Sequence, residues 1–353
     1  MSHARTDRCP LCGADNACAI VQAQGDPAAC DRCWCRDAAI SESLVAQVPP
    51  EARGRACICA RCVSASTSAA AAGVRITEDP GGRAAVELTH GQHRVLIARL
   101  GAQILSWSGP DGDALWTARD AAYDAGAPVR GGVPVVFPWF GNHATDPDKP
   151  AHGFVRSREW TVVRTGPASV TFAARDDEQT RALWPHEFSV ELEVTLTEDL
   201  RVTMRVHNPS AEAFTFEQAL HTYFAVGEVQ TASVHGLEGV SCTEHARAPE
   251  ASWDPDAPLR FRAETDRVFQ DTPAEITLEA PALGRALTLT APQARSAIVW
   301  NPWPKKTARL SQMAPDDWQM FCCVETANCK ESAVELAPGQ RHELTLTLRR
   351  AQR

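Results

Sequence analysis

Nine of the thirteen cysteines lie within the first 62 residues, and this crowding restricts the fold of the chain more than any other feature. Their spacings are Cys9-x-x-Cys12, Cys18, Cys30-x-x-Cys33-x-Cys35 and Cys57-x-Cys59-x-x-Cys62. A tight turn can place two cysteines of such a pair on one metal ion, and zinc takes four ligands in a tetrahedron. A segment this short with few large apolar side chains needs a link of that kind to hold a fold. We therefore expect a small zinc-type module over residues 1–62.

Two four-cysteine zinc sites would use eight of these nine cysteines and leave either Cys18 or Cys30 without a metal. A dense cluster in a reducing compartment favours metal ligation over disulfides. A redox-active thiol pair is the weaker alternative, because Cys9-x-x-Cys12 does not open a helix within a βαβ pattern. We expect the metal to fold the module and to take no part in catalysis.

The composition changes after residue 62. Residues 63–73 (VSASTSAAAAG) are small and nearly uncharged, which is typical of a flexible linker. Residues 74–353 contain few cysteines and are expected to form one large domain. The apolar share of the chain, 44%, is sufficient for a sizeable core.

The large segment is expected to consist mostly of β-strands. In residues 188–197, every second side chain is apolar, and residues 200–206 repeat this alternation after a short polar break. That pattern predicts a hairpin of half-buried antiparallel strands. Further short strands are expected at residues 86–89, 94–100, 160–163, 169–173, 285–291 and 343–349. Many strands with little helical periodicity indicate a mainly β fold, a large antiparallel sandwich.

The overall charge excludes some classes of partner. The net charge is -9, so the chain has no general attraction for nucleic acid or an anionic membrane. The arginines of the cysteine-rich segment alternate with acidic residues and form no basic stripe. No stretch is long and apolar enough for a membrane span, and the polar N-terminus lacks the apolar core of a secretory signal. We therefore expect a cytoplasmic protein without nucleic-acid or membrane partners.

Two loop segments carry cationic side chains that suit an anionic ligand. Arg130 stands in the small-residue turn RGGVP, and His152 and Arg156 lie four residues apart in PAHGFVR. A planar guanidinium group matches a carboxylate or a phosphate. Taken alone, each segment could equally be an ordinary surface loop.

Three further residues have an unusual setting. His221 is the single ionisable group of an apolar, aromatic run (ALHTYF), where it is either a satisfied core residue or an acid–base group. Glu325 follows the largely apolar FCCV, so a strand would carry it into a partly buried place and raise the pKa of its carboxyl group. It could also be a salt-bridged structural residue. Asp266, in ETDRVFQ, is a weaker signal.

Taken together, these segments resemble the hexose-6-phosphate mutarotases, which are relatives of aldose 1-epimerase. The similar runs follow one another over about residues 74–350 and are RGGVPVVFPWFG, PAHGFVR, LHTYFAVGEV, VHGLEG, ETDRVFQ, IVWNPW and CVETAN. The resemblance implies a galactose-mutarotase-like antiparallel β-supersandwich. It also implies His221 as general acid, Glu325 as general base, no catalytic cofactor, and sugar contacts from Arg130, His152, Arg156 and Asp266. The two arginines would bind the phosphate.

The N-terminal segment has a resemblance of its own. Cys33-Trp34-Cys35, together with RGRACIC (53–59), resembles the cysteine-rich CWC family over residues 9–62. The recurring cysteines of that family correspond to all nine except Cys30, which implies a metal-ligand set of Cys9, Cys12, Cys18, Cys33, Cys35, Cys57, Cys59 and Cys62.

The two resemblances predict a monomeric enzyme that acts on a hexose 6-phosphate. Three alternatives remain: an epimerase for unphosphorylated sugar, a non-catalytic sugar-phosphate sensor, and a zinc-dependent interaction or nucleic-acid protein. The paired arginines disfavour the first, the acid–base pair disfavours the second, and the acidic balance disfavours the third. Pro304-Lys305-Lys306 departs from the family pattern and would add positive charge at the rim of the site.

Overall fold

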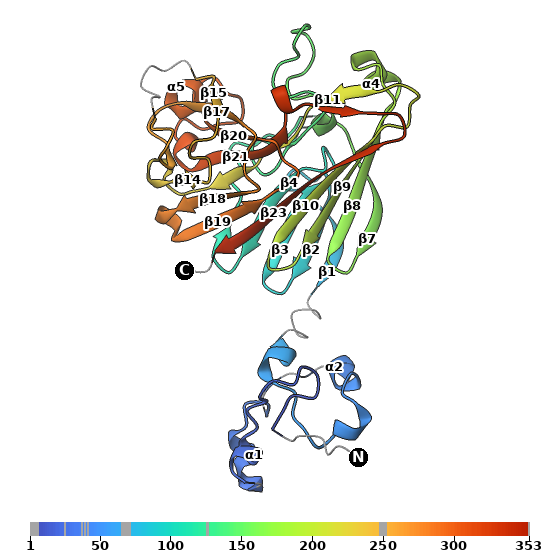
Figure 1. The fold of residues 1–353 in the computed structure, drawn as a ribbon, viewed down its shortest axis with the longest axis vertical. Helices are drawn as coiled ribbons and strands as arrows, with labels where there is room; N and C mark the ends of the chain where they lie inside the picture. Colours follow the sequence, from blue (N-terminus) through green and yellow to red (C-terminus); the bar gives the residue numbers. More distant parts are fainter. Residues whose placement is uncertain are drawn as a thin grey trace. The chain divides into compact units, whose positions relative to one another are not determined.

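The computed structural model describes residues 7–24, 26–36, 38, 40, 42–64, 72–124, 127–246 and 253–351. The chain divides into two compact units, Met1–Ala72 and Gly73–Arg353 (Figure 1). Most of the expected linker, residues 65–71, lies outside the described residues, and the first strand already begins at Gly73.

The N-terminal unit contains short helical segments: α1 (Ala19–Gln22), η1 (Pro27–Arg32), α2 (Glu42–Ala46) and η2 (Pro50–Ala52). Segments of this length are not stable alone, because helix nucleation costs more than a few hydrogen bonds return. The apolar cluster that they surround is small and consists of Cys9, Leu44, Val48, Ala52, Ile58, Cys59 and Val63. This core agrees with the expectation of a small cysteine-rich module that needs further cross-links.

The C-terminal unit is built from antiparallel sheets, as expected. One described sheet has nine strands, in the order β16 (Leu259–Arg260), β14 (Ser233–His235), β18 (Glu275–Ala280), β19 (Arg285–Thr290), β23 (Arg341–Ala351), β10 (Leu200–His207), β9 (Ser189–Leu196), β8 (Ser169–Arg175) and β7 (Thr161–Gly166). A five-stranded sheet, β1 (Gly73–Glu78), β2 (Ala84–His90), β3 (His93–Ala98), β4 (Ile104–Gly109) and β5 (Gly112–Asp113), lies behind it in Figure 1, and β2 and β3 contact β9.

A seven-stranded sheet forms the other half of this unit. Its described strands run in the order β15 (Cys242–Glu244), β17 (Thr265–Gln270), β20 (Ser296–Asn301), β21 (Phe321–Asn328), β12 (Gln218–Leu220) and β6 (Val135–Val136), and β13 (Tyr223–Ala225) also pairs with β21. A short ribbon joins β11 (Phe214–Phe216) to β22 (Val334–Leu336). One large apolar core runs between the sheets. The mainly β, mutarotase-like fold predicted from the sequence is thus confirmed.

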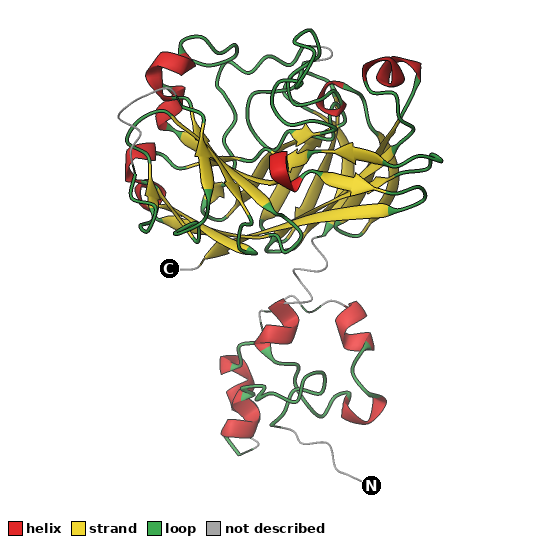
Figure 2. Ribbon diagram, turned by 45° about the horizontal axis from the view of Figure 1, so that its top comes forward, coloured by secondary structure: helices red, strands yellow, loops and turns green. Residues whose placement is uncertain are grey.

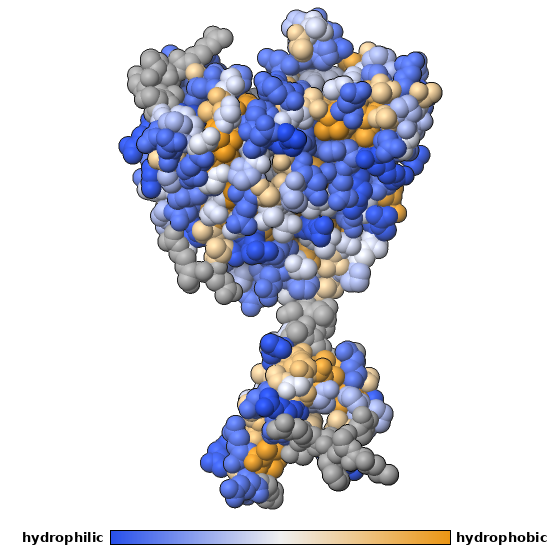
Figure 3. Space-filling model, viewed as in Figure 1, coloured by the Kyte–Doolittle hydropathy of each residue, from blue (hydrophilic) through white to orange (hydrophobic). Residues whose placement is uncertain are grey.

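The predicted hairpin is β9 and β10, paired in the register Leu200↔Leu196. Every second residue of β9 is buried, as the alternating sequence requires. On the outer face, Arg205 donates hydrogen bonds to Glu193 of β9 and Glu343 of β23. Such cross-strand ion pairs keep this face polar, and in Figure 3 it is mostly hydrophilic.

Loops and short helices connect these strands. The helical segments are η3 (Val155–Ser157), α4 (Glu178–Leu183), η4 (Val229–Thr231), η5 (Pro281–Leu283), α5 (Trp303–Thr307), η6 (Asp317–Gln319) and η7 (Lys330–Ser332). Figure 2 shows that most loops of this unit gather on one side of the sheets. Among the described residues, no helix has both the length and the apolar character to cross a membrane.

Gly153 fixes the loop that carries His152. Its φ is +70°, and a Cβ atom there would lie 1.9 Å from the carbonyl oxygen of Phe137. His152 itself has a φ of +64°. The backbone of this loop therefore approaches the Phe137 strand end more closely than any residue with a side chain allows.

We expect Gly153→Ala to destabilise the C-terminal unit by at least about 2 kcal/mol, through left-handed strain and the steric clash together. Thermal unfolding followed by circular dichroism should show a fall in Tm of about 4–8 °C. Gly284→Ala is the matched control, because Gly284 has a φ of +62° but open space around its Cβ position. An equal shift in both variants would contradict the close approach as the cause.

Candidate active site

The seven-stranded sheet and its loops enclose a cavity of about 520 Å³. All of the expected site residues except Arg156 line it: Arg130, His152, His221, Asp266 and Glu325. They come from separate parts of the chain, since Glu325 lies on β21, Asp266 on β17 and His221 between β12 and β13. Antiparallel pairing of β12 and β13 with the same strand, β21, brings the histidine beside the glutamate.

His221 and Glu325 face each other inside this cavity. The Nε2 atom of His221 lies 3.4 Å from Oε1 of Glu325. The residues are 8% and 2% exposed, respectively, so the pair is almost fully shielded from water. Within the described residues, Nδ1 of His221 and Oε2 of Glu325 have no hydrogen-bond partner. Unsatisfied buried polar atoms are costly, and these two leave polar capacity for a ligand in the cavity.

Burial pushes the pKa values of this pair in opposite directions. The pKa of His221 is lowered well below 6.5, first by burial and then by the positive fields of His152, Arg156 and Arg130. The pKa of Glu325 is raised well above 4.5, first by burial and then by the negative charge of Asp266. In the empty cavity at neutral pH, the pair therefore carries one proton, and that proton resides on Glu325.

Aromatic rings hold His221 in place. The ring of Tyr223 stacks on it with the centroids 4.9 Å apart and an interplanar angle of 8°. Trp300 of β20 contacts both rings edge-on. The backbone N–H of His221 donates to the carbonyl oxygen of Pro134 at 3.0 Å. The side chain is thus fixed from several sides, and the aromatic faces offer apolar surface for a sugar ring.

Arg130 and Arg156 are cations without an acidic partner. Nη1 of Arg130 lies 3.4 Å from the hydroxyl oxygen of Tyr223, and Nη2 of Arg156 donates to the carbonyl oxygen of Ala151 at 2.7 Å. Neither makes an ion pair with a carboxylate in the part of the chain that the structure describes. Arg156 does not line the cavity, but its charge acts on His152, His221 and Glu325.

His152 lies between these cations and His221. Its ring centroid is 5.4 Å from that of His221. Burial, together with the charges of Arg156, Arg130 and Lys330, lowers the pKa of His152 to about 3. His152 is therefore neutral at physiological pH and can both donate and accept a hydrogen bond.

Asp266 is held by Lys306 of α5. The Nζ atom of Lys306 lies 3.0 Å from Oδ2 of Asp266 and 3.2 Å from Oε1 of Glu264. The sequence analysis expected the lysines after NPW to add positive charge at the rim. Lys306 does line the cavity, but these two carboxylates compensate its charge.

Several residues that the sequence analysis did not assign also line the cavity: Phe140, Asn142, Tyr223, His245, Trp300 and Lys330. Tyr223 and Trp300 stand in the runs HTYF and IVWNPW, so their neighbours gave a signal. Lys330 gave none, because it enters the site through a turn with a φ of +58°.

The N-terminal unit contains a separate cluster of thiols. The sulfur atoms of Cys9, Cys12, Cys59 and Cys62 lie within 4.8 Å of one another. Cys9 and Cys62 are 3.8 Å apart and Cys12 and Cys59 are 3.6 Å apart, far longer than a disulfide bond. Four thiolates around one zinc ion at about 2.3 Å lie about 3.8 Å from each other. This cluster could therefore hold a metal ion. The described side chains do not include that of Cys30, the residue expected to bind no metal.

Comparisons with known proteins agree with both units. The cysteine-rich CWC family model matches residues 9–64, and the aldose 1-epimerase model matches residues 84–349. A "Putative glucose-6-phosphate 1-epimerase" of Escherichia coli is 30% identical over 70% of this chain and 84% of its own. One of the same description from Cenchrus ciliaris is 29% identical over 68% of this chain and 76% of its own.

Solved structures show the same fold. A protein from Salmonella typhimurium described as a "putative mutarotase" superposes with a TM-score of 0.71 at 25% identity and covers 79% of this chain and 97% of its own. Because the family match extends over residues 84–349, well beyond half of the sequence, this chain belongs to the aldose 1-epimerase family.

Proposed function

We propose that this chain interconverts the α and β anomers of a hexose 6-phosphate, with glucose 6-phosphate as the first substrate to test. The observation that carries the proposal is the buried His221–Glu325 pair beside two arginines that lack acidic partners. An acid and a base 3.4 Å apart can serve two oxygens of one small substrate. The arginines supply the charge that a phosphate group requires.

Ring opening needs a proton removed from the anomeric hydroxyl and a proton given to the ring oxygen. In the proposed reaction Glu325, as carboxylate, accepts the first and His221, as imidazolium, donates the second. The bond beside the new carbonyl group rotates, and the ring closes on the other face with the two roles reversed. Acid–base assistance of this kind is worth on the order of 10²–10⁴-fold.

The phosphate group also helps to place the proton. The charges of Arg156 and Arg130 lower the pKa of His221 in the empty cavity. A phosphate bound to these arginines offsets their field, so the pKa of His221 rises when substrate binds. The shared proton then moves toward His221, which is the state that ring opening requires. A free sugar lacks this charge and leaves the proton on Glu325.

We propose a structural zinc ion for the cluster of Cys9, Cys12, Cys59 and Cys62. Four sulfur ligands at distances that match a tetrahedron suit zinc, and a closed thiolate set has no open position for substrate. These residues belong to the N-terminal unit, and the sugar chemistry above uses none of them.

We expect His221→Ala and Glu325→Gln each to lower the rate of anomer exchange of glucose 6-phosphate by at least about 100-fold, because each removes one proton-transfer group. NMR exchange spectroscopy on the α and β anomers measures this rate directly. Circular dichroism is the control for folding. Near-wild-type exchange by either folded variant would refute the assignment, and no exchange by the wild-type protein would favour a sensing role.

The phosphate proposal predicts a substrate-dependent loss. Arg156→Ala should reduce kcat/KM for glucose 6-phosphate by about 10–150-fold, the value of one charge-assisted hydrogen bond, and change turnover of free glucose much less. Arg158→Ala is the matched control, because Arg158 pairs with Asp177 away from the cavity. Equal losses on both sugars would contradict a phosphate role and favour a general aldose epimerase.

The charge of Asp266 should appear in the pH profile. The pair loses its shared proton when Glu325 deprotonates, and Asp266 raises the pKa of that carboxyl group. Asp266→Asn removes this effect, so the pKa of Glu325 falls and the alkaline limb of kcat/KM moves to lower pH. Glu264→Gln, which also removes a carboxylate from Lys306, should leave the limb in place. A limb that does not move in Asp266→Asn would show that Glu325 does not set it.

A further inference from the structure

A second ring of thiols lies in the N-terminal unit, apart from the cluster of Cys9, Cys12, Cys59 and Cys62. The sulfur atoms of Cys33 and Cys35 are 3.3 Å apart, and those of Cys18 and Cys57 are 3.6 Å apart. Cys33 also contacts Cys18, and Cys35 contacts Cys57, so the four thiols close a ring. All four are free thiols.

The local structure brings these cysteines together without help from a disulfide. The backbone N–H of Cys18 donates to Oδ1 of Asn16, which fixes the loop before α1. The indole N–H of Trp34 donates to the carbonyl oxygen of Asn16 at 3.1 Å. Trp34 therefore anchors the Cys33-Trp34-Cys35 turn to the loop that carries Cys18. This contact gives a physical reason for a tryptophan between the two cysteines.

The distances fit a metal better than bare thiols. Ligand sulfurs around a tetrahedral zinc ion lie about 3.8 Å apart, and the two closest pairs of the ring are near that value. A disulfide would need about 2.05 Å. Four thiol groups packed side by side gain little from one another unless a cation binds them, because thiol hydrogen bonds are weak.

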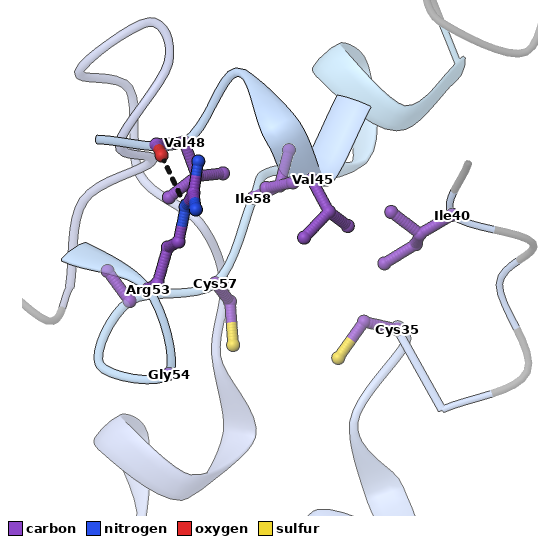
Figure 4. Close-up of a pocket in the computed structure, with 9 residues that line it drawn as sticks. Cys35, Ile40, Val45, Val48, Arg53, Gly54, Cys57 and Ile58 are labelled. Atoms are coloured by element: carbon purple, nitrogen blue, oxygen red, sulfur yellow. Dashed lines mark hydrogen bonds between the residues drawn. The ribbon is translucent and has the colours of Figure 1, made fainter. Parts of the chain in front are cut away.

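The surroundings of the ring are apolar on one side. Cys35 and Cys57 form part of the wall of a pocket of about 280 Å³, together with Ile40, Val45, Val48 and Ile58. Figure 4 shows both sulfur atoms below these apolar side chains. An apolar wall offers no oxygen ligand and limits the access of water. These surroundings suit a closed, structural four-thiolate site rather than an open catalytic one.

We propose that Cys18, Cys33, Cys35 and Cys57 bind a second zinc ion, in a site nested within the first. The first site takes its ligands from the two ends of the module, Cys9-x-x-Cys12 and Cys59-x-x-Cys62, and the second takes all of its ligands from the chain between them. Only Ile58, a buried core residue, separates Cys57 of the second site from Cys59 of the first. Each metal therefore holds the segment that positions the other.

The nesting explains how so small a core can hold the module. The described apolar cluster contains few large side chains, and two of its members are the ligands Cys9 and Cys59. A structural zinc site supplies folding free energy directly. The second ion would tie the middle of the chain, from Cys18 to Cys57, while the first ties its ends. The proposal is independent of the sugar reaction, since no residue of the cavity takes part.

Zinc content of the purified, reduced, full-length chain tests the proposal. The wild-type protein should hold about two zinc ions, one for each four-thiolate set. Cys57→Ser and Cys35→Ser should each lose about half of the zinc, and so should Cys62→Ser in the first site. Cys30→Ser is the matched control and should keep the wild-type content. One zinc ion in the wild-type protein, unchanged in Cys57→Ser, would overturn the second site.

A serine variant could unfold the whole module and release both ions, so a second measurement uses the wild-type chain alone. Alkylation followed by mass spectrometry should find Cys18, Cys33, Cys35 and Cys57 protected in the zinc-loaded protein and labelled at least about tenfold faster after a chelator removes the metal, because a bound thiolate is a poor nucleophile. Labelling of these four at the same rate with and without the chelator would overturn the proposal. So would a mass that reveals a disulfide among them.

Discussion

The chemistry of the large unit depends on two ionisable groups that are buried opposite one another. Water would otherwise solvate His221 and Glu325, and the sheet denies them that water. The cost is lowest when the pair is electrically neutral, which is why burial lowers the pKa of the histidine and raises that of the carboxyl group. The neutral pair still holds one proton that can move. A reaction that shifts protons between two oxygens of one sugar needs this arrangement and no more.

The arginines make this balance responsive to substrate. Arg130 and Arg156 lack acidic partners in the described structure, and both disfavour a protonated His221. A dianion that binds to them removes this penalty at the moment when an acid is required. Phosphate binding and proton placement would then be one electrostatic event, and selectivity for a phosphorylated sugar would follow without any separate discriminating contact.

The sequence allowed some parts of this structure to be predicted and concealed others. The β9–β10 hairpin was predictable because one face is solvated, which produces strict alternation. The residues of β21 are all buried, so its pattern could not show which side Glu325 faces. Nor could spacing alone pair Lys306 with Asp266, since that contact joins α5 to a strand well before it. Eight candidate ligands likewise gave no grouping into two sets, because the grouping depends on the path of the chain between them.

The two units, so different in architecture, have one physical problem in common. In the cavity, Arg130 and Arg156 form a group of positive charges that the described protein does not neutralise. In the module, thiols gather in two sets that would repel one another once ionised. Like charges are costly to bring together, and a fold that does so gains stability when an ion of the opposite sign binds. A dianionic sugar phosphate for the first unit and a dication for each thiol set are the ligands that this argument requires.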